Sequence, residues 1–121
     1  MLLPVQEKAE DMERVDILGT EWSVELLTDA QWLKHKSLTE DRRNDSNING
    51  VCFGYERKIL VRSDLEINHR KSVLRHEIIH AFQYESGVFY AMSFNWDVEN
   101  ETEWLGRMIP KITKAWNQVI R

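Results

Sequence analysis

Residues 74–82 read Leu-Arg-His-Glu-Ile-Ile-His-Ala-Phe and lie within a helical pattern from about Asn68 to Ser86. At ~100° per residue, His76 and His80 are only ~40° apart around a helix, so their imidazoles share one face. The apolar side chains gather on the opposite face: Leu74, Ile78 and Ala81, with Phe82 alongside. Gly87 follows where a left-handed residue commonly ends a helix. The segment predicts a helix that packs on one side and presents two imidazoles on the other.

Upstream of this helix the pattern has a period of two. Val15–Gly19 and Glu21–Leu27 alternate apolar and polar residues, which is typical of two antiparallel strands. Val51–Tyr55 and Lys58–Arg62 indicate a hairpin that turns at Glu56–Arg57. We therefore expect a small antiparallel sheet before the helix.

The remaining segments complete an α+β order. Val5–Arg14 has the spacing of a short helix or a loose arm, and Asp29–Lys36 that of a short helix. The polar run Lys36–Gly50 indicates an exposed loop. A second helical pattern extends over Val98–Arg121, with a kink or break expected at Pro110.

Length and composition limit the class of protein. The 121 residues, 42% of them hydrophobic, suffice for one domain with a real core, and no repeat or linker divides residues 1–121. A net charge of −4 argues against a protein that coats nucleic acid, because such proteins present a basic face. We expect one α+β domain with no nucleic-acid partner.

The sequence also suggests a compartment. Cys52 is the single cysteine and cannot form an internal disulfide, which favours a reducing environment. The chain becomes acidic before a signal-peptide apolar region could form, and no stretch approaches the ~20 apolar residues of a membrane span. The expectation is a cytoplasmic protein without a membrane partner.

The chemistry lies in the His-Glu-x-x-His pattern of His76, Glu77 and His80. A catalytic Zn²⁺ takes three protein donors and one water, and two neutral imidazoles spaced i, i+4 can share one ion. Glu77 is displaced too far around the helix to bind the same ion comfortably. Its carboxylate is placed to act as general base on the water.

A third zinc ligand must come from elsewhere in the chain. Among the histidines only His35 and His69 remain, and His69 could approach if the helix starts early. Glu99 and Glu103 are better candidates, because their i, i+4 spacing puts them on one face while Glu101 points away. One of the pair could bind the ion while the other accepts a hydrogen bond from a ligand imidazole.

If such a site attacks a carbonyl group, it also needs a donor for the oxyanion of the tetrahedral intermediate. Tyr84 lies on the histidine face, one turn beyond His80, and is the preferred candidate. The sequence does not choose between it and four alternatives: Tyr55, His69, Tyr90 and Arg107. Phe94 and Trp96 lie between the two helices and could wall the cleft.

The pattern resembles a known family. An HExxH helix followed by Glu99-Asn-Glu-Thr-Glu103 looks like the gluzincin arrangement, in which a second helix carries E-x-x-x-D. More closely, Leu74–Gly87 resembles small zinc metallopeptidases encoded by bacteriophages and prophages of Gram-positive bacteria. Glu103–Ile112 also resembles their C-terminal helix.

The resemblance implies a minimal zincin-like domain with one Zn²⁺ held by His76, His80 and Glu99, and with Glu77 as general base. Glu103 departs from the family, which has aspartate there, so the roles of Glu99 and Glu103 could be exchanged. The implied activity is zinc-dependent hydrolysis of a peptide or protein substrate in the cytoplasm of a bacterial host. An extended substrate would pair with an edge strand, expected at Lys58–Arg62.

The alternative function is zinc binding without hydrolysis of a substrate. The chain would then be a zinc-binding protein in which the ion holds the two helices together while the surface binds a phage or host regulator. No histidine follows His80, although larger gluzincins place a downstream histidine or tyrosine near the oxyanion, and this favours the rival.

Overall fold

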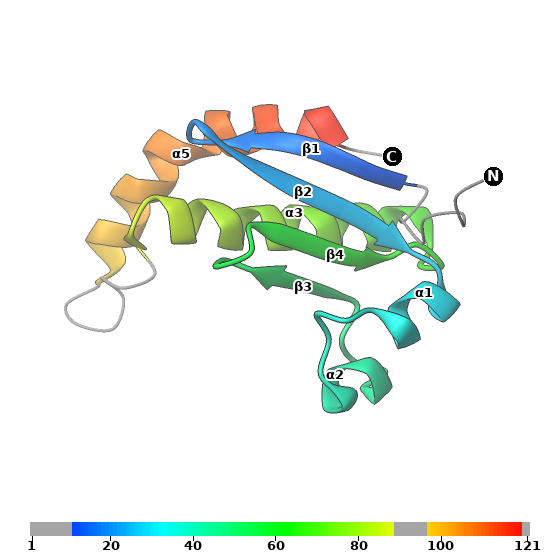
Figure 1. Cartoon of the computed structure of the whole chain (residues 1–121). Helices are drawn as coiled ribbons and strands as arrows, with labels where there is room; N and C mark the ends of the chain where they lie inside the picture. Colours follow the sequence, from blue (N-terminus) through cyan, green and yellow to red (C-terminus); the bar gives the residue numbers. More distant parts are fainter. Residues whose placement is uncertain (1–10, 89–96, 120–121) are drawn as a thin grey trace.

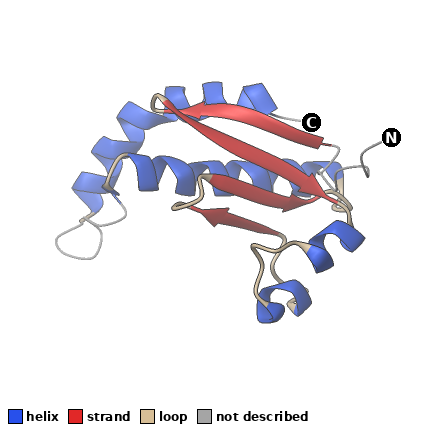
Figure 2. Cartoon of the chain, in the orientation of Figure 1, coloured by secondary structure: helices blue, strands red, loops and turns tan. Residues whose placement is uncertain are grey.

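The computed structural model describes residues 11–88 and 97–119, which form an α+β fold around a small mixed sheet (Figures 1 and 2). The strands are β1 (Asp11–Ile17), β2 (Thr20–Leu27), β3 (Gly50–Phe53) and β4 (Lys58–Arg62). The helices are α1 (Asp29–Lys34), α2 (Glu40–Asn44), α3 (Ile67–Glu85) and α5 (Val98–Val119). The expected order of a sheet followed by two long helices is confirmed.

The sheet is mixed, so the expectation of an antiparallel sheet is wrong for one pair of strands, β2 and β4. The strand order is β1-β2-β4-β3, in which β2 and β4 run parallel and the two outer pairs are antiparallel. Ile59, Leu60 and Val61 are all fully buried, so β4 is covered on both faces, as is typical of an interior strand. The expectation that Lys58–Arg62 forms an edge is therefore also wrong, and β3 is the edge strand on that side.

Two hydrophobic cores cover the two faces of the sheet. On one face Val24, Ile59 and Val61 pack with α3 and α5, whose contributions include Ile78, Phe82 and Trp104. On the other face Leu27 and Leu60 pack with Trp32 of α1 and with Leu38. Neighbouring residues of one strand point to opposite faces, so Leu60 and Val61 serve different cores.

The first hairpin is longer than the sequence indicates. β1 pairs with β2 from Asp11↔Leu26 to Ile17↔Thr20, so the expected helix or arm is wrong for Asp11–Arg14, and residues 5–10 lie outside the described part of the chain. The turn places Leu18 at φ 52° and Gly19 at φ 87°. Positive φ at both central residues is typical of a two-residue type I′ turn, whose twist matches that of the flanking strands.

The polar segment between Lys36 and Gly50 contains α2, so the expectation of a simple loop there is wrong. The Thr39 hydroxyl accepts a hydrogen bond from Arg42 N at 3.3 Å and caps this short helix. The turn expected at Glu56–Arg57 is confirmed, since Arg57 N donates to Gly54 O at 3.2 Å.

The two long helices agree with the helical patterns in the sequence. Gly87 follows α3 at φ 79°, as expected for a residue that ends a helix. Pro110 is exposed and lies within α5. The helix continues through it, so the break that the sequence allowed at this position is excluded. α5 packs on α3, where Trp104 Nε1 donates to Ser86 Oγ at 3.1 Å. No helix in the described ranges has the length and apolar character needed to cross a bilayer.

Leu60→Ala tests the interior position of β4. Removing a fully buried side chain from the core against α1 should lower the free energy of unfolding by about 2–5 kcal/mol. Leu33→Ala is the control, because Leu33 is 46% exposed and its loss should change stability by less than about 0.5 kcal/mol. Urea denaturation followed by circular dichroism measures both variants, and equal effects would contradict the buried position.

Candidate functional site

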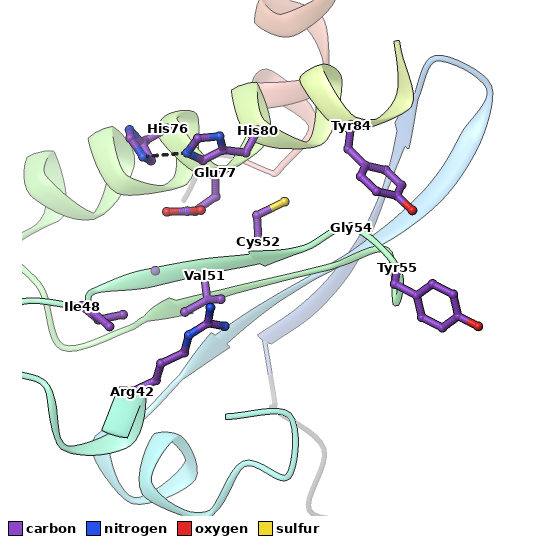
Figure 3. A pocket seen from close by; sticks show the side chains of 11 residues that line it. Arg42, Ile48, Val51, Cys52, Gly54, Tyr55, His76, Glu77, His80 and Tyr84 are labelled. Carbon is purple, nitrogen blue, oxygen red and sulfur yellow. Dashed lines mark hydrogen bonds between the residues drawn. The ribbon is translucent and has the colours of Figure 1, made fainter. Parts of the chain in front are cut away.

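A cleft of about 530 Å³ extends along the open edge of β3 (Figure 3). His76, Glu77 and His80 of α3 line one side, and Arg42 of α2 lines the other. Cys52 of β3 points into the cleft from the strand between them. The HExxH segment therefore faces a concave surface that includes a strand edge.

The two histidines converge on one point. The Nε2 atoms of His76 and His80 lie 3.1 Å apart, and the rings meet edge to face with centroids 4.7 Å apart. Two imidazoles on a tetrahedral zinc, each at about 2.0–2.1 Å, would have their nitrogens about 3.4 Å apart. The observed spacing is close to this value, so the pair fits two positions of a zinc coordination shell.

Gln83 fixes the orientation of one of these rings. His80 Nδ1 lies 2.8 Å from Gln83 Oε1, an acceptor that favours the tautomer with the proton on Nδ1 and the lone pair on Nε2. Burial, and then the nearby charge of His80, lower the pKa of His76, which favours the neutral form that binds metal. The sequence interpretation missed Gln83, although the i, i+3 spacing from His80 is a readable signal.

Glu77 is 7% exposed and lies between α3 and β3. Burial raises its pKa, with a smaller opposing effect from His80, so the carboxylate is more basic than a free one. Gly50 makes this position possible, because a Cβ there would lie 2.7 Å from Val73 Cγ1 and 3.2 Å from Glu77 Oε2. The glycine lets the strand edge approach the carboxylate directly.

Cys52 borders the same carboxylate. Burial, and then the negative charge of Glu77, raise the pKa of its thiol to about 12. The sulfur is therefore a protonated thiol at neutral pH, and this reduces its reactivity as a nucleophile.

Tyr84 occupies the end of the cleft beside the β3–β4 turn. Its ring meets Trp22 edge to face at 6.1 Å, and a Cβ on Gly54 would clash with the ring. The next residue, Glu85, accepts hydrogen bonds from Trp22 Nε1 at 2.8 Å and from Arg57 Nε at 2.7 Å. The Tyr84 hydroxyl points away from the two histidines (Figure 3).

The backbone of β3 offers unpaired groups to the cleft. Arg62 N donates to Asn49 O at 3.0 Å, so these two residues form a hydrogen-bonded pair of the antiparallel ladder. Such pairs alternate, so Val51 turns its N–H and C=O to β4, while Gly50 and Cys52 turn theirs to the open edge. Within residues 11–88 and 97–119, no strand pairs with that edge.

The predicted acidic ligands are not brought to the histidines. Glu99 and Glu103 are exposed on α5, which packs beside β1 at the sheet edge opposite to the cleft. Across the residues that the structure describes, no three His, Cys, Asp or Glu side chains gather as a metal site. The structure therefore joins two of the expected donors and leaves the third apart.

The other candidates lie apart from the histidine pair or outside the described ranges. His35 Nε2 lies 3.3 Å from Glu25 Oε1 and its Nδ1 accepts from Ser37 N, so its ring is occupied elsewhere. His69 on α3 and Arg107 on α5 are exposed, and Tyr55, 92% exposed, stands at the mouth of the cleft. Three predicted residues lie outside the described part of the chain: Tyr90, Phe94 and Trp96.

In comparisons with known proteins, no family model matches the chain, and no curated protein or solved structure matches it. The chemistry of the cleft is therefore argued from its own residues.

Gln83→Ala tests the orientation of His80. Loss of the amide oxygen frees the imidazole to change tautomer, so zinc affinity should fall by about 10–100-fold. Gln83→Glu keeps an acceptor and should retain most of the affinity, and exposed Gln118→Ala is the neutral control. Competition with a chromophoric chelator measures all three. Equal affinity of Gln83→Ala and wild type would contradict the role of Gln83.

Gly50→Ala tests the contact between β3 and α3. A Cβ there overlaps Val73 and the Glu77 side chain, so stability should fall by about 1–3 kcal/mol. Gly106→Ala is a matched control in the exposed part of α5, where a Cβ meets nothing within 4 Å and alanine should stabilise by about 0.5–1 kcal/mol. Thermal and urea unfolding compare the two, and a stabilised Gly50→Ala would contradict the close approach.

Proposed function

We propose that the protein is a zinc-dependent peptidase of the minimal zincin type. The observation that carries the proposal is the convergence of the His76 and His80 Nε2 atoms at 3.1 Å beside the buried carboxylate of Glu77. Together they supply two nitrogen donors and a base at one end of an open cleft. The free edge of β3 alongside them suits an extended peptide backbone as substrate.

Each residue has a definite task in this proposal. His76 and His80 hold the ion through Nε2, and zinc, when bound, supplies a Lewis acid and acidifies water. Glu77 takes a proton from the attacking water and returns it to the leaving amine. The backbone of Gly50 and Cys52 holds the substrate in register. Tyr84 lines the same cleft, but its hydroxyl points away from the histidines, so the donor to the oxyanion is left unassigned.

The third protein donor is left open by the structure, and Glu99 and Glu103, which lie apart from the histidines, are the candidates that the sequence offers. Elemental analysis of wild type, His80→Ala, Glu99→Ala and Glu103→Ala tests this separately from activity. We expect one zinc per chain in the wild type, loss in His80→Ala, and loss in only one of the two acidic variants. Retention of zinc in both acidic variants would show that neither carboxylate of α5 binds the ion.

Glu77→Gln tests the hydrolytic function. The amide cannot accept the proton, so cleavage of unstructured peptides should fall by at least about 100-fold while zinc remains bound. Glu101→Gln is the control, since it removes one carboxylate from an exposed position on α5. Mass spectrometry of digested casein measures cleavage, and wild-type turnover retained by Glu77→Gln would overturn the role of the base.

The same experiment distinguishes the rival function. A zinc-binding protein that acts only as a regulatory partner would bind one ion and cleave nothing, in wild type and Glu77→Gln alike. The opening at the edge of β3 favours the peptidase, because it leaves room for a peptide backbone beside the base.

A further inference from the structure

We propose that Arg42 makes the cleft selective for extended peptides that carry an acidic side chain. This inference deepens the proposed function, because it concerns what the same cleft binds. It rests on the position of Arg42, on the absence of a carboxylate partner for it, and on the geometry of a strand added to β3.

Arg42 is placed at the cleft by two contacts. Its backbone N–H donates to the Thr39 hydroxyl, which fixes the first turn of α2. Its guanidinium carbon lies 5.7 Å from the centroid of the Phe53 ring, a cation–π arrangement that holds the side chain over β3. Figure 3 shows the guanidinium on the opposite side of the strand from Glu77.

The guanidinium of Arg42 has no acidic partner in the ranges that the structure describes. Two other arginines have carboxylate partners, since Arg57 Nε lies 2.7 Å from Glu85 Oε1 and Arg62 Nη1 lies 2.9 Å from Asp29 Oδ1, while Arg43 Nη2 donates to His35 O. No described carboxylate lies within ion-pair distance of Arg42. Its charge is therefore available to a ligand, in a chain whose net charge is −4.

A peptide paired with β3 would direct alternate side chains to the two walls of the cleft. Side chains of an added strand alternate as those of β3 do, with Cys52 toward α3 and Val51 toward the core beneath α2. Residues on the α3 side would meet the histidines and Glu77. Residues on the other side would pass Arg42, whose planar donors match a carboxylate in two parallel hydrogen bonds.

The test measures binding, so that it does not depend on turnover. The zinc-loaded full chain carrying Glu77→Gln would be titrated with acetylated heptapeptides Ser-Thr-Val-Xaa-Val-Thr-Ser, in which Xaa is Glu, Gln or Lys. Amide chemical shifts of Gly50 and Cys52 report docking at the edge of β3. Arg42→Glu is then added to this background, at an exposed position of α2. Lys114→Glu on α5 is the control with the same change of charge.

We expect the Glu peptide to bind at least about fivefold more tightly than the Lys peptide, with this order reversed by Arg42→Glu and kept by Lys114→Glu. Equal binding of the two peptides, or an unchanged order in Arg42→Glu, would overturn the inference. So would shifts at Gly50 and Cys52 that follow protein concentration alone, since a second copy would then occupy the edge.

The inference and the proposed function fail separately. Cleavage that requires Glu77 but shows no acidic preference would leave the peptidase standing and overturn the role of Arg42. Charge-selective binding without any cleavage would support Arg42 and remove the hydrolytic function. Absence of binding by all three peptides at millimolar concentration would overturn the inference whatever the activity.

Discussion

The close packing of α3 against the edge strand β3 is the contact on which the rest of the site depends. Gly50 and Gly54 carry no Cβ where Glu77 and Tyr84 lie against the strand, so the helix approaches to a distance that any other residue would prevent. This approach buries Glu77, which makes its carboxylate more basic, and leaves His76 and His80 on the open side of the same helix. One packing contact thus separates a buried base from two exposed donors within five consecutive residues.

Much of the fold could be predicted from the sequence, because local periodicity encodes it. The i, i+4 histidines, the apolar face of α3 and the left-handed Gly87 are consequences of helix geometry alone. The parallel join of β2 and β4 could not be deduced in the same way, because pairing is a long-range choice, although the fully buried run Ile59-Leu-Val61 is the signature of an interior strand. α2 was missed because its five residues carry no apolar periodicity, only the cap at Thr39.

The candidate site was predictable where one helix supplies it and unpredictable where separate segments must meet. His76, Glu77 and His80 come together because they share α3, and Gln83 joins them by the same spacing. The i, i+4 spacing of Glu99 and Glu103 is equally regular, but it says nothing of where α5 lies relative to α3. In the structure α5 packs toward β1, and the edge β3 is at the other side of the sheet. Arg42 could not be assigned to the cleft for the same reason, since α2 reaches it through a long connection.

The open edge of β3 also affects the tendency of the protein to aggregate. An unpaired strand edge is a template on which any extended chain can nucleate, so natural proteins shorten such strands or crowd them with charge. β3 is only four residues long and runs at the bottom of a cleft, between the imidazoles of α3 and the guanidinium of Arg42. Both features, the short strand and the charged side chain beside it, are among those by which exposed strand edges are kept from pairing with other sheets. The length and surroundings of β3 therefore limit edge-to-edge association while its outer N–H and C=O groups stay unpaired within the described part of the chain.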